Sequence, residues 1–313
     1  MPANTPAKIS SPGTSLLERI GNTPLVRFDR LTAHLPGIQI LGKAEWTNPG
    51  GSVKDRPASA IVLDALAHQE LCPGRRLLDA TSGNTGIAYA MLGAALAFPV
   101  TLCMPSNVSP ERKRILQAYG AEIIWTDPAD SSDGAIRKAI ELAHDPQYFY
   151  ADQYSNPNNW RAHYRGTAPE ILEQTEGRIT HFIAGTGTGG TFTGVARRLQ
   201  EANPEIECIV MQPDSPFHGL EGMKHYATSI VPAIYDPTLA SRILEVETEA
   251  AYAMAKRLGR TEGLLVGISA AAAVVACLRL AEELAGQGRE ATIVTILPDS
   301  ADKYLSDRFW DEE

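Results

Sequence analysis

Asn48-Pro49-Gly50-Gly51-Ser52-Val53-Lys54-Asp55-Arg56-Pro57 is a glycine turn that is predicted to lead into a helix. Gly50 and Gly51 permit a tight backbone that other residues would strain. Ser52 is suited to cap the helix that follows, and Pro57 suits its first turn. Lys54 should therefore lie where the loop becomes a helix, and there the positive end of the helix dipole disfavours a charged ammonium. An amine that loses its proton easily can attack a carbonyl and form a Schiff base. The alternative is a solvated surface lysine.

Two further glycine turns each follow a short apolar strand and precede a helix. They are Thr81-Ser82-Gly83-Asn84-Thr85-Gly86 and Gly185-Thr186-Gly187-Thr188-Gly189-Gly190-Thr191. Strands are predicted at residues 39–45, 76–80, 100–104, 121–125, 180–184, 207–212 and 292–297. Helices predicted between them indicate parallel βαβ units and an α/β fold. Because ligands of such sheets collect at the carboxyl ends of the strands, the three turns should share one functional edge.

The bulk properties are those of a globular protein with room for two domains. The chain has 313 residues, of which 44% are hydrophobic, and a net charge of −9 that does not favour a nucleic-acid or acidic-membrane partner. The apolar run at residues 87–104 is interrupted by glycine and proline, so a buried helix and strand explain it better than a membrane span. Residues 1–15 are polar and are predicted to form a loose arm. The cysteines are far apart, form no metal-type pair and indicate reduced thiols in the cytoplasm: Cys72, Cys103, Cys208 and Cys277.

Together the three turns resemble the pyridoxal-phosphate enzymes of fold type II. Within these, the chain is most similar to the cysteine synthase (O-acetylserine sulfhydrylase) family, in particular its B-type branch. The resemblance covers nearly the whole chain, from Ile20-Gly21-Asn22-Thr23-Pro24-Leu25 to Pro298-Asp299-Ser300 and Lys303-Tyr304-Leu305-Ser306. It implies pyridoxal 5′-phosphate carried by Lys54 and a homodimer.

The resemblance also implies a tryptophan synthase β-like fold, with two three-layer αβα domains, mainly parallel sheets and the cofactor in the cleft between them. A dense run of Asn and Pro at residues 156–159 interrupts the alternation of strands and helices between about residues 151 and 176, so a domain boundary is predicted nearby. We expect residues 43–155 to form the smaller domain, and residues 1–42 and 156–313 to form the larger one.

The third turn is the candidate phosphate site. Backbone N–H groups that glycine leaves accessible at a helix start can cradle an anion without a cationic side chain. The resemblance assigns the cofactor phosphate to Gly187, Thr188, Gly189, Gly190 and Thr191.

A rival interpretation of the same turn is a nicotinamide-dependent dehydrogenase, since Gly185, Gly187 and Gly190 satisfy the pattern G-x-G-x-x-G. That pattern also needs an acidic residue at the end of the next strand, where this chain has Gln212-Pro213 and a late Asp214. It would not explain Lys54 either. A P-loop is excluded, because no lysine follows the glycines.

The second turn is the candidate carboxylate site, with hydroxyl, amide and backbone donors at a helix start. Simple helix capping is the alternative role for its hydroxyls. The resemblance gives Asn84 a hydrogen bond to the ring hydroxyl of the cofactor. The residues expected to bind the substrate carboxylate are Thr81, Ser82, Gly83, Thr85 and, through the resemblance, Gln153.

Ser269 matches the residue that faces the pyridine nitrogen in the family, although a helix N-cap is the competing role. A neutral hydroxyl there leaves the ring a weaker electron sink, which suits β-elimination and replacement better than transamination. The chain departs from the family pattern at Ala270 and Ala271, where the family usually has Ser or Thr followed by Gly. We expect this difference to alter the floor of the pocket or its hydration.

These features predict a cysteine synthase that replaces the leaving group of an activated serine with sulfide or another sulfur donor such as thiosulfate. O-Acetylserine is the expected donor. Lys224 lies in a segment that borders the pocket in relatives and would favour an anionic donor such as O-phosphoserine, unless it is a solvated loop lysine. The alternatives are cystathionine β-synthase and serine/threonine dehydratase within the same cofactor class, and a non-catalytic scaffold outside it.

Overall fold

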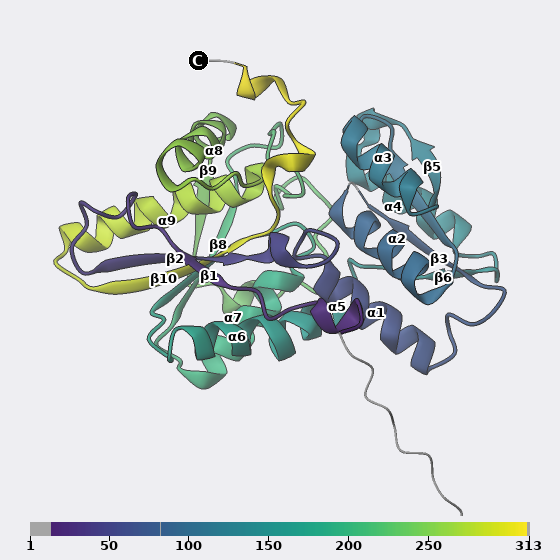
Figure 1. Cartoon of the computed structure of the whole chain (residues 1–313), viewed down its shortest axis with the longest axis horizontal. Coiled ribbons are helices and arrows are strands. Elements are labelled where there is room, and N and C mark those ends of the chain that lie inside the picture. The colour runs from purple at the N-terminus through teal and green to yellow at the C-terminus, as the bar shows by residue number, and fades with distance from the viewer. Residues whose placement is uncertain (1–13, 82, 312–313) are drawn as a thin grey trace, which may run out of the picture.

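The computed structural model describes residues 14–81 and 83–311, so most of the predicted arm at residues 1–15 lies outside the described chain. Within these residues the strands form two sheets, which lie side by side in Figure 1. The larger sheet has the order β1 (Leu25–Arg27), β2 (Ile38–Ala44), β10 (Ala291–Leu297), β7 (His181–Gly185), β8 (Glu207–Pro213) and β9 (Arg242–Val246). The smaller sheet has the order β5 (Glu122–Thr126), β4 (Val100–Pro105), β3 (Arg76–Ala80) and β6 (Tyr148–Tyr150).

Both sheets are parallel apart from the antiparallel pairing of β1 with β2. Strand β10 is central in the larger sheet, because it pairs with β2 on one side and with β7 on the other. Every residue of β4 is buried, as expected for a parallel strand covered on both faces. The predicted α/β fold with mainly parallel sheets is confirmed.

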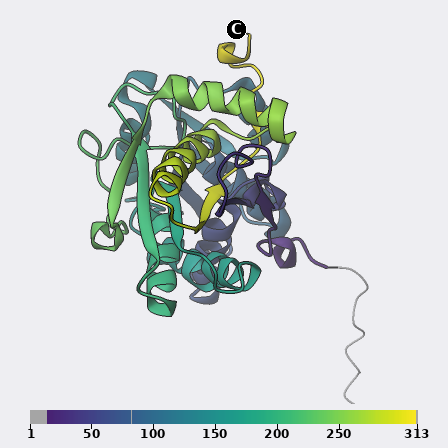
Figure 2. The same ribbon diagram turned by 90° about the vertical axis from the view of Figure 1, so that its left-hand side faces the viewer.

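Helices cover both faces of each sheet. In Figure 1, α5 (Pro157–Ala162), α6 (Ala168–Gln174) and α7 (Gly190–Ala202) lie below the larger sheet, and α8 (Thr248–Glu262) and α9 (Ile268–Gly286) lie above it; Figure 2 gives the side view. On the smaller sheet, α1 (Asp55–Ala67), α2 (Asn84–Leu96) and α3 (Pro110–Ala118) share a core with Leu77, whereas α4 (Ser131–Leu142) shares one with Leu78. Helix α1 also packs on α5 and so connects the two halves.

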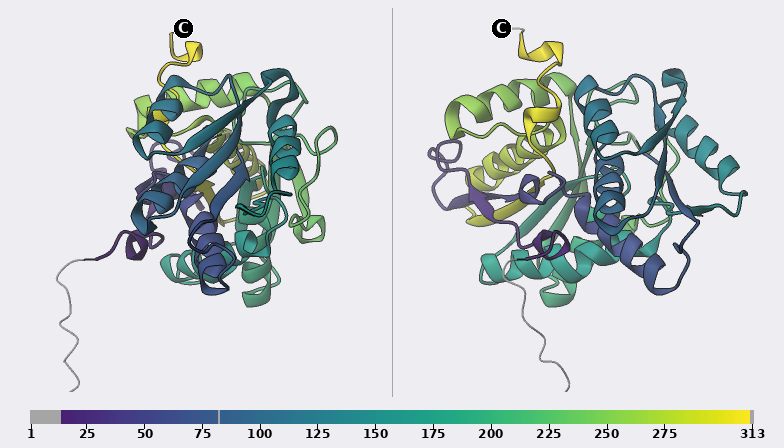
Figure 3. Two further views of the ribbon diagram at one scale, coloured as in Figure 1. Left: turned by 90° about the vertical axis from the view of Figure 1, so that its right-hand side faces the viewer. Right: turned by 45° about the vertical axis from the view of Figure 1, so that its right-hand side comes forward.

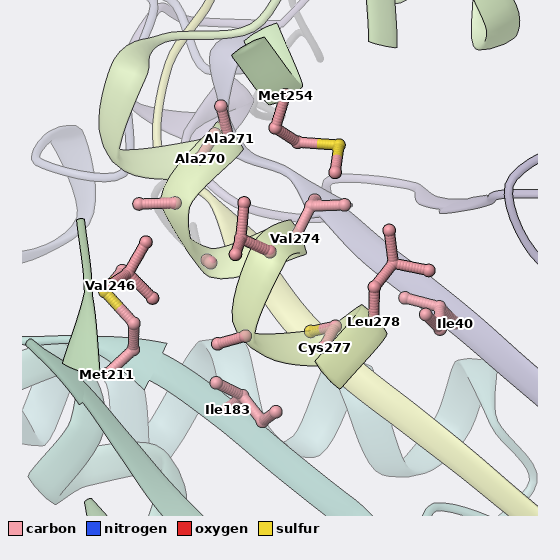
Figure 4. Packing of buried hydrophobic residues seen from close by; sticks show 14 of the residues in the cluster. Ile40, Ile183, Met211, Val246, Met254, Ala270, Ala271, Val274, Cys277 and Leu278 are labelled. Carbon is pink, nitrogen blue, oxygen red and sulfur yellow. The ribbon is translucent and has the colours of Figure 1, made fainter. Parts of the chain in front are cut away.

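Most side chains of helix α9 are buried, and they pack into the core of the larger sheet. Figure 4 shows its side chains against the residues of four strands. The helix contributes Ala270, Ala271, Val274, Cys277 and Leu278, and the strands contribute Ile40, Ile183, Met211 and Val246. This packing holds the first turn of α9, and with it Ser269, at the carboxyl edge of the sheet.

The region predicted as a break, residues 151–176, contains helices α5 and α6 joined by a π-helical turn at His163–Thr167. The Asn and Pro run is the start of a helix: the Asn156 side chain accepts the N–H of Asn158, and Pro157 occupies the first helical position. The short strands β6 and β9 were also not predicted. The C-terminal segment after β10 rises along the boundary between the two halves in the right panel of Figure 3.

Of the helices in the described part of the chain, none has the combination of length and apolar composition that crossing a membrane requires.

Candidate active site

The loops at the carboxyl edges of both sheets enclose a cavity of about 700 Å³. It brings together predicted residues from all three glycine turns and from three other segments. The predicted residues that line it are Lys54, Thr81, Gly83, Asn84, Thr85, Gln153, Gly187, Thr188, Gly189, Thr191, Lys224 and Ser269. Gly190 begins α7 behind this surface, and Ser82 lies outside the described residues.

Lys54 immediately precedes α1, as predicted. The prediction that Ser52 caps this helix is wrong: its Oγ accepts the N–H of Lys54 at 3.2 Å, ahead of the helix, and no side chain caps α1. The turn is instead held by the segment after β10, where Pro298 O accepts the N–H of Val53 at 2.8 Å. Burial lowers the pKa of the Lys54 ammonium, although the charges of Asp299 and Glu45 oppose that change. Burial therefore shifts Lys54 toward the neutral amine that a nucleophile or base requires.

The carboxylate turn is organised by its threonines. Thr81 Oγ1 accepts the N–H groups of Gly83 and Gly86 at 3.1 and 3.2 Å, which shapes the loop. Thr85 Oγ1 donates to Gln153 Oε1 at 2.8 Å, so the two predicted carboxylate ligands are directly connected. The Thr85 hydroxyl therefore does not cap α2, whereas the Thr81 hydroxyl does, because it accepts the N–H of Gly86 in the first turn of that helix.

Asn84 points its amide toward a buried carboxylate. Its Nδ2 donates to Asp299 Oδ2 at 2.7 Å, and within the described residues its buried Oδ1 has no partner. Tyr304 donates its hydroxyl to the same Asp299 oxygen at 2.7 Å. The Asn84 amide therefore retains hydrogen-bonding capacity in the wall of the cavity.

The phosphate turn has the features of an anion cradle. Gly189 has φ +80° and precedes α7, a conformation that favours glycine. The space beside Gly187 is closed by backbone, because a Cβ there would lie 2.1 Å from Gly222 O. No described residue accepts a hydrogen bond from the N–H of Gly187, Thr188 or Gly189. Three free donors at a helix N-terminus suit a phosphate.

Ser269 lies in the first turn of α9 and lines the cavity, but the N-cap of that helix is Gly267. The alternative role of Ser269 as the N-cap is therefore wrong. Ala270 and Ala271 have no exposed surface and belong to the core of the larger sheet rather than to the cavity wall. The expectation that they alter the pocket floor is wrong, since both side chains lie in the core, and an effect on the hydration of the pocket stays a prediction.

Lys224 is not a solvated loop lysine. It is 6% exposed, and its Nζ lies 2.9 Å from Asp133 Oδ1 on α4. Nearby in the same loop, Glu221 pairs with Arg112 of α3. Two ion pairs thus hold this loop against the helices of the smaller sheet. The loop supplies the cation in one pair and the anion in the other.

Sequence reasoning missed three buried polar residues around the cavity: Arg112, Asp299 and His163. Arg112 lies in the polar run Pro110-Glu111-Arg112-Lys113-Arg114, which resembles a solvated helix. In the structure its guanidinium packs over the Tyr304 ring at 4.8 Å and beside Gly83. His163 Nε2 lies 3.2 Å from Thr191 Oγ1 in the phosphate turn. Asp299 lay within a motif that supported the resemblance, but nothing local indicated its contact with Asn84.

A family model described as pyridoxal-phosphate dependent enzyme matches residues 16–299. The chain belongs to this family. The cysteine synthase of Aquifex aeolicus is 51% identical over 296 residues, which span 93% of this chain and 90% of that protein. The cysteine synthase B of Escherichia coli K12 is 38% identical over 300 residues, or 96% of this chain and 97% of that protein.

Two solved structures extend this similarity to three dimensions. The cysteine synthase of Entamoeba histolytica has a TM-score of 0.89 and 35% identity, covering 100% of this chain and 94% of that one. An O-ureido-L-serine synthase has a TM-score of 0.88 and 36% identity, covering 96% of each chain. The predicted fold type II and the pyridoxal phosphate cofactor are confirmed, and the nicotinamide alternative is not favoured.

The residues of this pyridoxal-phosphate enzyme fit the cofactor. The three free N–H groups of the phosphate turn match its phosphate, and the Asn84 amide matches a ring oxygen. The pKa of Lys54, which burial lowers, suits a bond to the aldehyde carbon of the cofactor.

Proposed function

We propose that the chain is a cysteine synthase that converts an O-activated serine and a sulfur nucleophile into cysteine. The observation that carries this proposal is a cavity in which a lysine whose pKa is lowered by burial, a phosphate cradle and a carboxylate turn meet. Similarity to curated cysteine synthases over most of the chain supports the same activity.

Bound pyridoxal phosphate would supply an electron sink that labilises the α-proton and the β-substituent of an amino acid. Lys54 would hold the cofactor and, once displaced by substrate, act as the base that removes and later returns the proton at the α-carbon. Residues 187–191 would bind the phosphate, and Ser269 would offer a neutral hydroxyl to the ring nitrogen. Thr81, Gly83, Thr85 and Gln153, with Ser82, would hold the substrate carboxylate.

The charge around Lys224 supports a donor whose activating group is uncharged. Because Asp133 lies 2.9 Å from the Lys224 ammonium, this cation is already balanced and offers little to a phosphate dianion. O-Acetylserine is therefore the proposed donor: acetate would leave the β-carbon first, and sulfide would then add there to give cysteine, whereas thiosulfate would give S-sulfocysteine. Rates with O-acetylserine and O-phosphoserine, measured for wild type, Lys224→Ala and Asp133→Asn, test this. A wild-type preference for O-phosphoserine that Lys224→Ala abolishes would reject it.

We also propose that residues 43–155 form the smaller domain, that residues 1–42 and 156–313 form the larger domain, and that the protein is a homodimer. The four cysteines are free thiols, which supports a reducing cytoplasmic location. Light scattering of the purified protein tests the dimer, and cell fractionation tests the location.

The decisive experiment for the activity is borohydride reduction of the purified protein followed by peptide mapping. We expect the cofactor tag on Lys54, and we expect Lys54→Ala to lose both the tag and cysteine formation. A wild-type protein that carries the tag but forms no cysteine from either activated serine would reject the proposed activity. Homocysteine as acceptor, and an assay without any acceptor, would then distinguish cystathionine synthesis from dehydration.

A further inference from the structure

Asp299 lies two residues after β10 and contacts three segments of the cavity. It forms an antiparallel bridge with Ser52 in the lysine turn, and its carbonyl oxygen accepts the N–H of Gly267, ahead of Ser269, at 3.0 Å. Its side chain accepts the Asn84 amide at 2.7 Å. The carboxylate is completely buried, so these contacts are made out of reach of solvent.

The fit around this carboxylate is tight. A Cβ on Gly267 would lie 2.0 Å from Asp299 Oδ1, so only glycine leaves room for the side chain as it stands. The Tyr304 hydroxyl donates to Oδ2 alongside Asn84 Nδ2. Asp299 is therefore held in one orientation by its backbone contacts and by two donors.

The direction of the Asn84 amide depends on Asp299. A carboxylate accepts hydrogen bonds, so it selects the NH₂ group of Asn84 over the carbonyl. The opposite end of the amide exerts no competing preference, because within the described residues the buried Oδ1 has no partner. Nδ2 has a second N–H, and no described residue other than Asp299 accepts from this nitrogen.

We propose that Asp299 is a positioning residue that fixes the Asn84 amide as a hydrogen-bond donor toward the ring oxygen of the bound cofactor. One N–H is anchored on Asp299, and the other is left for the cofactor. A donor at this point stabilises the deprotonated ring oxygen over the protonated one. The inference rests on the proposed role of Asn84.

The matched change is Asp299→Asn, which keeps the shape but offers Asn84 either an oxygen or a nitrogen. Both orientations of the Asn84 amide then become accessible, and the carbonyl orientation favours a protonated ring oxygen. We expect the absorption band of the bound cofactor to gain a component at shorter wavelength. We also expect the dissociation constant for pyridoxal phosphate, measured by reconstituting the apoprotein, to rise about tenfold, in line with the loss of a charge-assisted hydrogen bond.

Two variants provide the controls. Tyr304→Phe removes the other donor to Asp299 but leaves Asn84 anchored, so its cofactor band should match wild type. Asn84→Ala removes the amide itself and should produce the same change in the band, and adding Asp299→Asn to it should have little further effect. If Asp299→Asn does not fold, Asn84→Ala still tests the premise that the Asn84 amide stabilises the deprotonated ring oxygen.

A wild-type cofactor band in folded Asp299→Asn, or in Asn84→Ala, would overturn the inference. So would an Asp299→Asn effect that persists in full when Asn84 is already alanine. If wild type binds no pyridoxal phosphate, the proposed function fails instead, and the two outcomes are therefore distinguishable.

Discussion

Replacing Arg56 with methionine removes the central cation of a buried ion network next to the lysine turn. Arg56 is 5% exposed and lies in the first turn of α1, two residues after Lys54. Its guanidinium donates to Glu45 at 2.7 and 2.8 Å and to Glu170 at 2.7 and 2.8 Å. Because Glu170 belongs to α6, the network fastens the start of α1 to the helices of the larger sheet.

The expected loss follows from the partners that remain. Removing one member of a buried ion pair costs about 3–5 kcal/mol, because the other charge stays buried without compensation. Lys43 Nζ remains 2.7 Å from Glu170, so that carboxylate keeps one cation and Glu45 bears most of the loss. We therefore expect a loss of about 3 kcal/mol, which corresponds to a fall in Tm of about 6–12 °C at the usual 2–4 °C per kcal/mol.

Urea unfolding and calorimetry of the apoprotein measure this loss without interference from the cofactor. Arg27→Met is the matched control: its ion pair with Asp29 has side chains that are 60% and 63% exposed, so its loss should be far smaller than that of Arg56→Met. If Arg56→Met cost no more than this control, the buried network would not be the anchor described above.

The same network predicts a dependence on pH. Burial alone would raise the pKa of Glu170, but hydrogen bonds and charge from Arg56 and Lys43 hold it at about 2. A depressed carboxyl pKa stabilises the fold above the unfolded pKa of about 4.3, and this contribution is lost as the pH falls toward the folded value. The difference in unfolding free energy between wild type and Arg56→Met should therefore shrink as the pH falls from about 4 to about 2, because Glu170 becomes protonated over this interval. A difference that stayed constant over this interval would contradict the assignment to Glu170.

Two further predictions concern the turns. Gly187→Ala should weaken pyridoxal phosphate binding about tenfold or more, because its Cβ would lie 2.1 Å from Gly222 O and displace the loop. The control is Gly286→Ala, whose Cβ would meet nothing within 4 Å and which should leave cofactor binding unchanged. Equal losses of cofactor affinity for the two variants in a fluorescence titration would refute the prediction. Thr85→Val removes the 2.8 Å bond to Gln153 and should raise the KM for the activated serine about fivefold, with cofactor affinity unchanged. Steady-state kinetics test this, and an unchanged KM would remove Thr85 from the carboxylate site.

The sequence predicted those parts of the fold whose signals are local. Strand β3 occupies the predicted residues 76–80. It could be predicted because Gly74 precedes and Gly83 follows a short apolar run there. The turns that follow β3 and β7 were likewise found from glycine and from the change between strand and helix periodicity. Their convergence on one cavity follows from the parallel sheet rule.

What the sequence did not predict depends on contacts between distant residues. Asp133 and Lys224 are 91 positions apart, and Asn84 and Asp299 are 215 apart, so no local pattern connects them. Arg112 has the sequence context of a solvated helix and becomes buried only when α3 packs beside the C-terminal segment. Strand β6 has three residues, which are too few for a periodic signal.

The central position of β10 has a consequence for the order in which the protein is made. Chains emerge from the ribosome amino end first, yet β10 fills the gap between β2 and β7, and the residues just after it clasp the lysine turn. A nascent chain that stops short of residue 291 leaves β2 without its parallel neighbour. Coenzyme capture must therefore wait until translation has passed this strand, and ribosome-stalled fragments ending before it should remain unable to retain vitamin B6.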